Sequence, residues 1–190
     1  MFTIRTYEAA DEVGWLRCRV LAFLDSAFYD AVETEKERYA HPAIELVAED
    51  GSEIVGLLDL EVALGPGVLA DRPGRGGMIW HLAVHPDHRR LGVAAALLAE
   101  AERRARAEGL VRLEAWTRDD PHVQRWYEAH GFEQIDGYLH VYLERKDLRG
   151  LEVGELRLVK AFAHYTGDAP EEIRQRYARV HDDVLYEKRL

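Results

Sequence analysis

The chain has only one cysteine among its 190 residues, Cys18, so no disulfide can form within it and we expect a reducing compartment. It also has no surplus of positive charge. The formal net charge is −10, which argues against binding to duplex nucleic acid. No apolar run reaches membrane-spanning length, and no basic and apolar leader opens the sequence. We therefore expect a cytoplasmic protein with no nucleic-acid or membrane partner, folded as a single domain over residues 1–190.

The first third of the sequence predicts a strand, two helices and a hairpin. Residues 4–7 alternate apolar and polar side chains, as strands do. A helix is predicted after Asp11, with apolar positions at helical spacing: Val13, Leu16, Val20 and Leu24. We expect Cys18 to be a small buried side chain within it and not a reactive thiol. A second, more polar helix is expected over residues 26–39, and Asp50-Gly51 predicts a hairpin between strands at 44–48 and 54–62.

The rest of the chain continues to alternate helices and strands. A glycine-rich loop over residues 65–77 lacks the spacing of a dinucleotide-binding fingerprint. A strand, a long helix ending at Gly109 and a strand at 111–116 follow, and Asp120-Pro121 predicts a helix that ends at Gly131. Further strands are predicted at 139–143 and 184–189. Between them, an extended C-terminal segment at about 145–182 contains a charged turn region, an apolar stretch at 156–165 able to pack, and an amphipathic helix at 170–179. This order indicates an α/β (α+β) fold with one mixed sheet.

One stretch, residues 79–98, passes from an apolar strand through Pro86 and a short loop into an alanine- and leucine-rich helix. The first N–H groups of a helix have no intrahelical partner, and the helix dipole is positive at that end. A strand that leads through a turn into a helix N-terminus therefore favours the binding of an anion such as a pyrophosphate.

Within this stretch, Arg89 to Ala94 resembles the coenzyme A signature of the GNAT superfamily of acyl-CoA-dependent N-acyltransferases, which is Gln or Arg, two residues, Gly, one residue, then Gly or Ala. Residues 126–132 resemble the second signature of that family, Tyr, three residues, Gly-Phe, with its tyrosine at Tyr127. Residues 4–11 and 184–190 resemble the first and last strands of the family. The resemblance implies a mostly antiparallel central sheet flanked by helices, and acetyl-CoA as the cosubstrate.

The resemblance also implies which residues hold acetyl-CoA: Leu82, Ala83, Val84, Arg89, Arg90, Leu91, Gly92, Val93, Ala94 and Ala95, together with Asp120 and Tyr127. Gly92 would let the backbone approach the pyrophosphate, and Ala94 would keep the next position small. The family often has Asn at the position of Asp120. Because a carboxylate cannot donate an amide N–H, either a water takes the place of that donor or Asp120 only caps the helix, and we expect the cap.

Two residues are candidates for catalysis. Tyr127 matches the family position that protonates the leaving thiolate, for which a phenol is suited by its pKa, and the alternative is an inward aromatic side chain that packs the helix. His81 is the titratable side chain in the centre of the strand and could take the proton of the amine, or it could be a satisfied core histidine. His81, His85 and His88 suggest a metal site at first, but Pro86 breaks any shared helix face and no carboxylate or cysteine completes the set, so no metal is expected.

The acceptor is the least specified part of the expected reaction. We expect a primary amine of a small molecule or of a protein. The segment at about 145–182 could form a wall of the acceptor pocket or a homodimer contact, and the sequence does not choose between these. A non-catalytic coenzyme A-binding module of the same fold is the alternative function.

Overall fold

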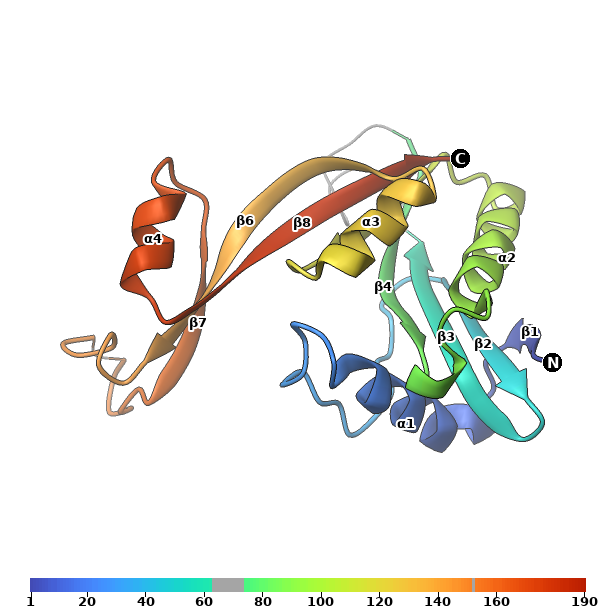
Figure 1. The fold of residues 1–190 in the computed structure, drawn as a ribbon, viewed down its shortest axis with the longest axis horizontal. Coiled ribbons are helices and arrows are strands. Elements are labelled where there is room, and N and C mark those ends of the chain that lie inside the picture. The colour runs from blue at the N-terminus through green and yellow to red at the C-terminus, as the bar shows by residue number, and fades with distance from the viewer. Residues whose placement is uncertain (63–73, 152) are drawn as a thin grey trace.

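An eight-stranded sheet runs through the molecule in the computed structural model, which describes residues 1–62, 74–151 and 153–190 (Figure 1). The strands lie in the order β1-β2-β3-β4-β5-β8-β6-β7. Neighbouring strands are antiparallel except for β4 and β5, which are parallel. The predicted class, a mixed and mostly antiparallel sheet flanked by helices, is confirmed. In chain order the strands are β1 Thr3–Thr6, β2 Ala43–Asp50, β3 Glu53–Val62, β4 Gly76–Val84, β5 Arg112–Thr117, β6 Glu133–Glu144, β7 Lys160–Tyr165 and β8 Arg179–Arg189.

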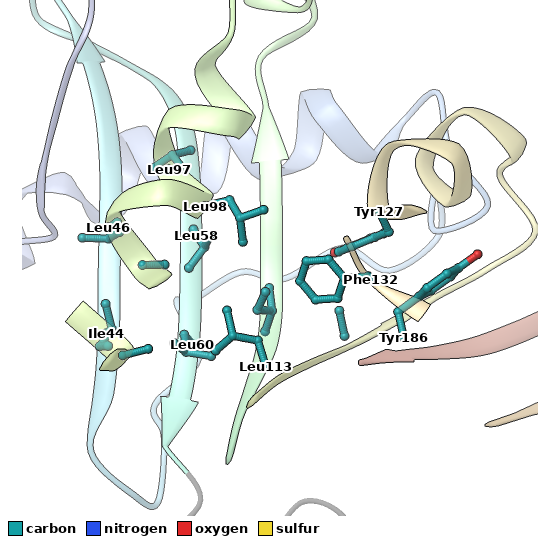
Figure 2. Packing of buried hydrophobic residues seen from close by; sticks show 14 of the residues in the cluster. Ile44, Leu46, Leu58, Leu60, Leu97, Leu98, Leu113, Tyr127, Phe132 and Tyr186 are labelled. Atoms are coloured by element: carbon teal, nitrogen blue, oxygen red, sulfur yellow. The ribbon is translucent and has the colours of Figure 1, made fainter. Parts of the chain in front are cut away.

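Helices cover both faces of the sheet. They are α1 Glu12–Phe23, α2 Val93–Ala107, α3 Pro121–Ala129 and α4 Pro170–Arg176, with short 3-10 turns at Ala9–Asp11 and Pro86–His88. α2 and α3 pack on one face, where wholly buried leucines such as Leu58 and Leu97 form the main core (Figure 2). α1 packs on the other face, through Trp15, against Leu57 and Ala83. Across the described ranges, no helix has both the length and the apolar character needed to cross a membrane.

Most of the predicted turns form as expected because they depend on local backbone chemistry. Asp50 pairs with Glu53 across the β2–β3 hairpin, and Gly51 there has φ 66°. Gly109 and Gly131 follow α2 and α3 with φ 76° and 82°, a left-handed conformation that glycine adopts at little cost. The loop predicted over residues 65–77 lies mostly outside the described residues, and its last two residues, Gly76 and Gly77, begin β4.

The helix predicted after Asp11 forms as α1, but its buried face differs from the one that the apolar spacing indicates, and the second predicted helix does not form. α1 buries Trp15, Cys18, Arg19 and Ala22, while Val13 and Leu24 are more than half exposed. The large indole of Trp15 fills the space above the sheet, and this fixes which face of the helix turns inward. Residues 26–39 form turns and irregular structure instead of a helix. In that segment the N–H of Lys36 donates to a carboxylate oxygen of Glu12, so side chains of other elements satisfy backbone groups that a helix would have paired.

The C-terminal part of the chain forms an arm that projects from the rest of the molecule (Figure 1). It consists of the far ends of β6 and β8, the edge strand β7, and α4. β6 and β8 are longer than the strands predicted at 139–143 and 184–189. The stretch at 156–165, expected to pack, leaves Leu156, Val159 and Phe162 between 59% and 69% exposed. The arm therefore has a structured backbone with exposed apolar side chains.

Candidate active site

The centre of the sheet opens where β4 separates from β5. The two strands pair in parallel from Gly76 opposite Arg112 to Ile79 opposite Ala115. Beyond Ile79, β4 remains paired with β3 on its other side, where Leu82, Ala83 and Val84 lie opposite Leu58, Leu57 and Gly56. Leu82, Ala83 and Val84 therefore line the widening gap between β4 and β5.

A bulge at Trp80 marks the start of this gap. His81 lies opposite Asp59 and Ile79 lies opposite Leu60, so Trp80 is an extra residue in β4. Its indole N–H donates to Glu61 at 2.8 Å, and 43% of the residue is exposed. The bulge bends β4 at the point where it leaves β5.

The loop after β4 turns sharply into α2. Arg90 has φ 64° and Gly92 has φ 85°, so the backbone passes twice through the left-handed region within three residues. Leu91 and Gly92 are exposed at this turn. The side chain of Val93 is buried in the core, so only its backbone faces the loop. α2 therefore begins beside the exposed loop, and the N–H groups of Val93, Ala94 and Ala95 in its first turn have no partner among the described residues.

The two arginines of this loop differ in their surroundings. Arg89 donates to the backbone oxygen of Ala22 at 3.0 Å and to the carboxylate of Asp25 at 3.2 Å, which ties the loop to the end of α1. Arg90 is exposed and makes no ion pair with any residue in the described part of the chain. Arg90 is thus the loop cation that remains available to a ligand.

Tyr127 lies on the inward side of α3. It is 5% exposed, its ring stacks on Tyr186 at 5.6 Å between centroids, and Phe132 meets it edge-on at 5.1 Å. Figure 2 shows its side chain directed from α3 toward β4. Burial raises the pKa of the Tyr127 phenol, so the hydroxyl keeps its proton at neutral pH.

Asp120 stands at the N-cap position of α3, but its side chain makes no capping hydrogen bond. Both carboxylate oxygens instead accept from the N–H of Ala27, at 2.9 and 3.2 Å. The prediction that the Asp120 side chain caps the helix is therefore wrong. A tertiary contact with the segment after α1 has replaced the local one.

His81 lies on the α1 face of β4 and is 7% exposed. Its Nε2 is 3.2 Å from a carboxylate oxygen of Glu37, and Arg19 directs its Nε–H toward His81 Nδ1 at 3.5 Å. Trp15 meets the imidazole edge-on at 5.1 Å. The Nε2–H tautomer satisfies both contacts, because Nε2 then donates to Glu37 and Nδ1 keeps its lone pair.

A second buried polar cluster lies beside His81. Lys36 is paired with Asp59 at 2.9 Å and also with Glu45, and the hydroxyl of Tyr39 donates to Asp59 at 3.0 Å. Asp59 is wholly buried. No pattern in the sequence indicates these partners, because they come from two strands, β2 and β3, and from an irregular segment that only the fold brings together. Among the described residues there is no group of three or more histidine, cysteine or acidic side chains suited to a metal ion.

Comparison with known proteins supports the class of protein that this fold defines. The family model described as the acetyltransferase (GNAT) family matches residues 6–132. An acetyltransferase from Pectobacterium atrosepticum is 31% identical over 123 residues, which cover 64% of this chain and 78% of that protein. One from Sodalis glossinidius is 29% identical over 126 residues, covering 66% and 80% respectively.

Solved structures share the fold at low sequence identity. The PaiA N-acetyltransferase of Thermoplasma acidophilum, solved in complex with coenzyme A, has a TM-score of 0.62 at 14% identity, covering all of this chain and 99% of that one. A GNAT family acetyltransferase of Elizabethkingia anophelis with acetyl-CoA bound has a TM-score of 0.55 at 17% identity, covering 100% and 98%. The chain belongs to the GNAT acetyltransferase family.

Proposed function

We propose that this protein transfers an acetyl group from acetyl-CoA to a primary amine of a small molecule or a protein, in the cytoplasm. The observation that carries the proposal is the position of Tyr127, a protonated phenol directed from α3 toward β4 beside the gap that opens between β4 and β5. A coenzyme A-binding module without turnover would need this side chain only for its packing against Tyr186 and Phe132.

The residues around the gap fit acetyl-CoA. The edge of β4 at Leu82, Ala83 and Val84 can pair with the amide groups of pantetheine as an added strand would. The unpaired N–H groups of α2 and the free cation of Arg90 suit the pyrophosphate, and a Cβ built at Gly92 meets no heavy atom within 4 Å, so the approach is open. Relatives of the same fold are solved with coenzyme A or acetyl-CoA bound.

The chemistry follows from these positions. The neutral amine nitrogen attacks the thioester carbon, a backbone N–H of β4 donates to the oxyanion, and the carbon–sulfur bond breaks. Tyr127 gives its proton to the departing thiolate. His81 takes the proton of the amine at Nδ1, because the contact from Arg19 at 3.5 Å is long for a hydrogen bond and an amine or a water can replace it.

Release of free thiol from acetyl-CoA, measured with a broad panel of primary amines, tests this proposal. We expect at least one amine to raise thiol release above the rate with water alone and to gain the mass of one acetyl group. Tight binding of acetyl-CoA with no amine-dependent thiol release would favour the non-catalytic module.

A further inference from the structure

The imidazole of His81 meets a carboxylate from the irregular segment between α1 and β2. Its Nε2 lies 3.2 Å from a carboxylate oxygen of Glu37. The hydrogen bond with His81 lowers the pKa of the Glu37 carboxyl, so this carboxyl is ionised at neutral pH. Half of the Glu37 side chain is exposed, whereas His81 is buried. A buried histidine beside the gap is therefore bonded to a carboxylate that reaches solvent.

Two neighbours in the chain fix the position of Glu37. The ammonium of Lys36 lies 2.9 Å from a carboxylate oxygen of Asp59, and the hydroxyl of Tyr39 donates to the same oxygen at 3.0 Å. Asp59 is wholly buried and lies opposite His81 in the β3–β4 pairing. The segment is thus anchored on both sides of Glu37, at the residue of β3 that faces His81.

The other carboxylates around His81 have different partners. Asp59 is bonded to its two anchors, and a carboxylate oxygen of Glu33 lies 3.8 Å from Arg19. Across the described ranges, Glu37 is the carboxylate that forms a hydrogen bond or ion pair with the imidazole. This contact is therefore specific to one of several nearby acids.

Arg19 gives the contact a chemical consequence. Its Nε–H is directed at Nδ1 of His81 at 3.5 Å, so a guanidinium stands beside the nitrogen that would take the proton of the amine. A neighbouring positive charge disfavours the imidazolium that forms, and a carboxylate in contact with the ring favours it. Glu37 therefore offsets Arg19 at the moment when His81 becomes charged.

We propose that Glu37 is a positioning residue for His81 in acetyl transfer. Its carboxylate accepts from Nε2–H, which leaves the lone pair of Nδ1 for the amine proton, and it stabilises the imidazolium. As the nitrogen–carbon bond forms, the proton passes from the amine to Nδ1, Nε2 keeps its own proton, and Glu37 stays ionised. The imidazolium then returns the proton to water. The proposal rests on the proposed acetyl transfer and on His81 as its base.

Two substitutions at Glu37 separate the hydrogen bond from the charge. Glu37→Gln keeps an acceptor oxygen without the charge, and Glu37→Leu has neither. The assay is thiol release with the amine of the panel that the unaltered protein acetylates fastest. General-base catalysis contributes about 10²–10⁴-fold, so we expect kcat to fall about tenfold in Glu37→Gln and about 10²-fold in Glu37→Leu. The Kd for acetyl-CoA should stay within a factor of about three in both.

Glu33→Gln is the matched control. Glu33 lies in the same segment, its side chain is 51% exposed like that of Glu37, and it pairs with Arg19 instead of His81. We expect Glu33→Gln to keep kcat within a factor of about three. An equal loss of kcat in Glu33→Gln and Glu37→Gln, or an unchanged kcat in Glu37→Leu, would overturn the proposal while acetyl transfer stands.

A double substitution separates positioning from a purely structural role. A residue that acts through His81 loses its effect when His81 is absent. In protein that already carries His81→Gln, the further change Glu37→Gln should therefore alter kcat by less than about twofold. A further fall of about tenfold in that background would show that Glu37 acts independently of His81 and would overturn the proposal.

Proton spectra of protein with isotopically labelled histidine test the contact without turnover. We expect a ring N–H signal of His81, assigned by its loss in His81→Gln, that persists in Glu33→Gln and is lost or shifted in Glu37→Leu. If no amine releases thiol, the proposed acetyl transfer fails and this spectrum decides the role of Glu37. Loss or a shift of the signal in Glu37→Leu would support the positioning of the imidazole. A signal that is absent from the unaltered protein, or that Glu37→Leu leaves unchanged, would overturn it.

Discussion

Substitutions at Gly92 separate two properties of the loop after β4, the stability of its left-handed backbone and its binding of acetyl-CoA. Its φ of 85° is left-handed, so any L-residue there costs roughly 1–2 kcal/mol of strain. A Cβ at this position meets no heavy atom within 4 Å, so no clash within the protein adds to that cost. Gly92→Ala and Gly92→Glu should each lower the free energy of unfolding by about 1–2 kcal/mol.

Gly92→Glu should weaken acetyl-CoA binding by more free energy than it costs in stability, and the cause is different. If the pyrophosphate lies on the first N–H groups of α2, the carboxylate of Gly92→Glu stands roughly 4–5 Å from a phosphate. At an effective dielectric constant of about 20 this repulsion is about 3–4 kcal/mol. The Kd for acetyl-CoA should therefore rise by a factor of at least about 100. Gly92→Gln has the same size without the charge and should weaken binding less.

Gly51 offers a matched control for the strain. It has φ 66°, its Cβ position is equally open, and it lies in the β2–β3 turn. Gly51→Glu should lose about the same stability in urea unfolding, roughly 1–2 kcal/mol, and bind acetyl-CoA as the unaltered protein does in isothermal titration calorimetry. Binding by Gly92→Glu within threefold of the unaltered protein would refute the placement of the pyrophosphate at α2.

Three further predictions concern Tyr127, Lys36 and His140. Tyr127→Phe should lower kcat by about 10²-fold or more and leave the Kd for acetyl-CoA within a factor of about three, since only the proton donor is lost; an unchanged kcat in the thiol-release assay would exclude this role. Lys36→Met should cost about 3–5 kcal/mol in urea unfolding, because it leaves the carboxylate of Asp59 buried without its cation, and a cost below about 1 kcal/mol would show that the pair is solvated. Burial lowers the pKa of His140 to about 4, below its unfolded value of about 6.5, so its contribution to stability is present above pH 6.5 and is lost as the pH falls toward 4. His140→Gln should therefore show a shallower loss of stability between pH 7 and pH 4, and equal pH profiles for the two proteins would contradict this reasoning.

Turns and strand alternation could be predicted from the sequence because they depend on neighbours in the chain. Asp50-Gly51, Gly109 and Gly131 end their elements where their backbone chemistry requires it. The stretch from β4 into α2 was also predictable, since the strand, the loop and the helix N-terminus are contiguous in the sequence.

Tertiary partners could not be predicted in the same way. α1 has two overlapping sets of apolar positions, and the large indole of Trp15 selected the face that the spacing of Val13 and Leu24 did not indicate. The segment at 26–39 failed to become a helix because its groups bond to distant partners, as Lys36 does with Asp59. The contacts of His81 with Arg19 and Glu37 join three separate elements, and a single sequence does not reveal such pairs.

The most direct test of acetyl transfer follows an isotopically labelled acetyl group from acetyl-CoA into an amine, by mass spectrometry of the product. With the unaltered protein and saturating acetyl-CoA, we expect the label to appear on the amine nitrogen, one acetyl group for each thiol released. Tyr127→Phe should transfer the same label at a much lower rate. Bound acetyl-CoA with no label in any amine, or thiol release with the label found only in acetate, would contradict acetyl transfer to an amine at this site.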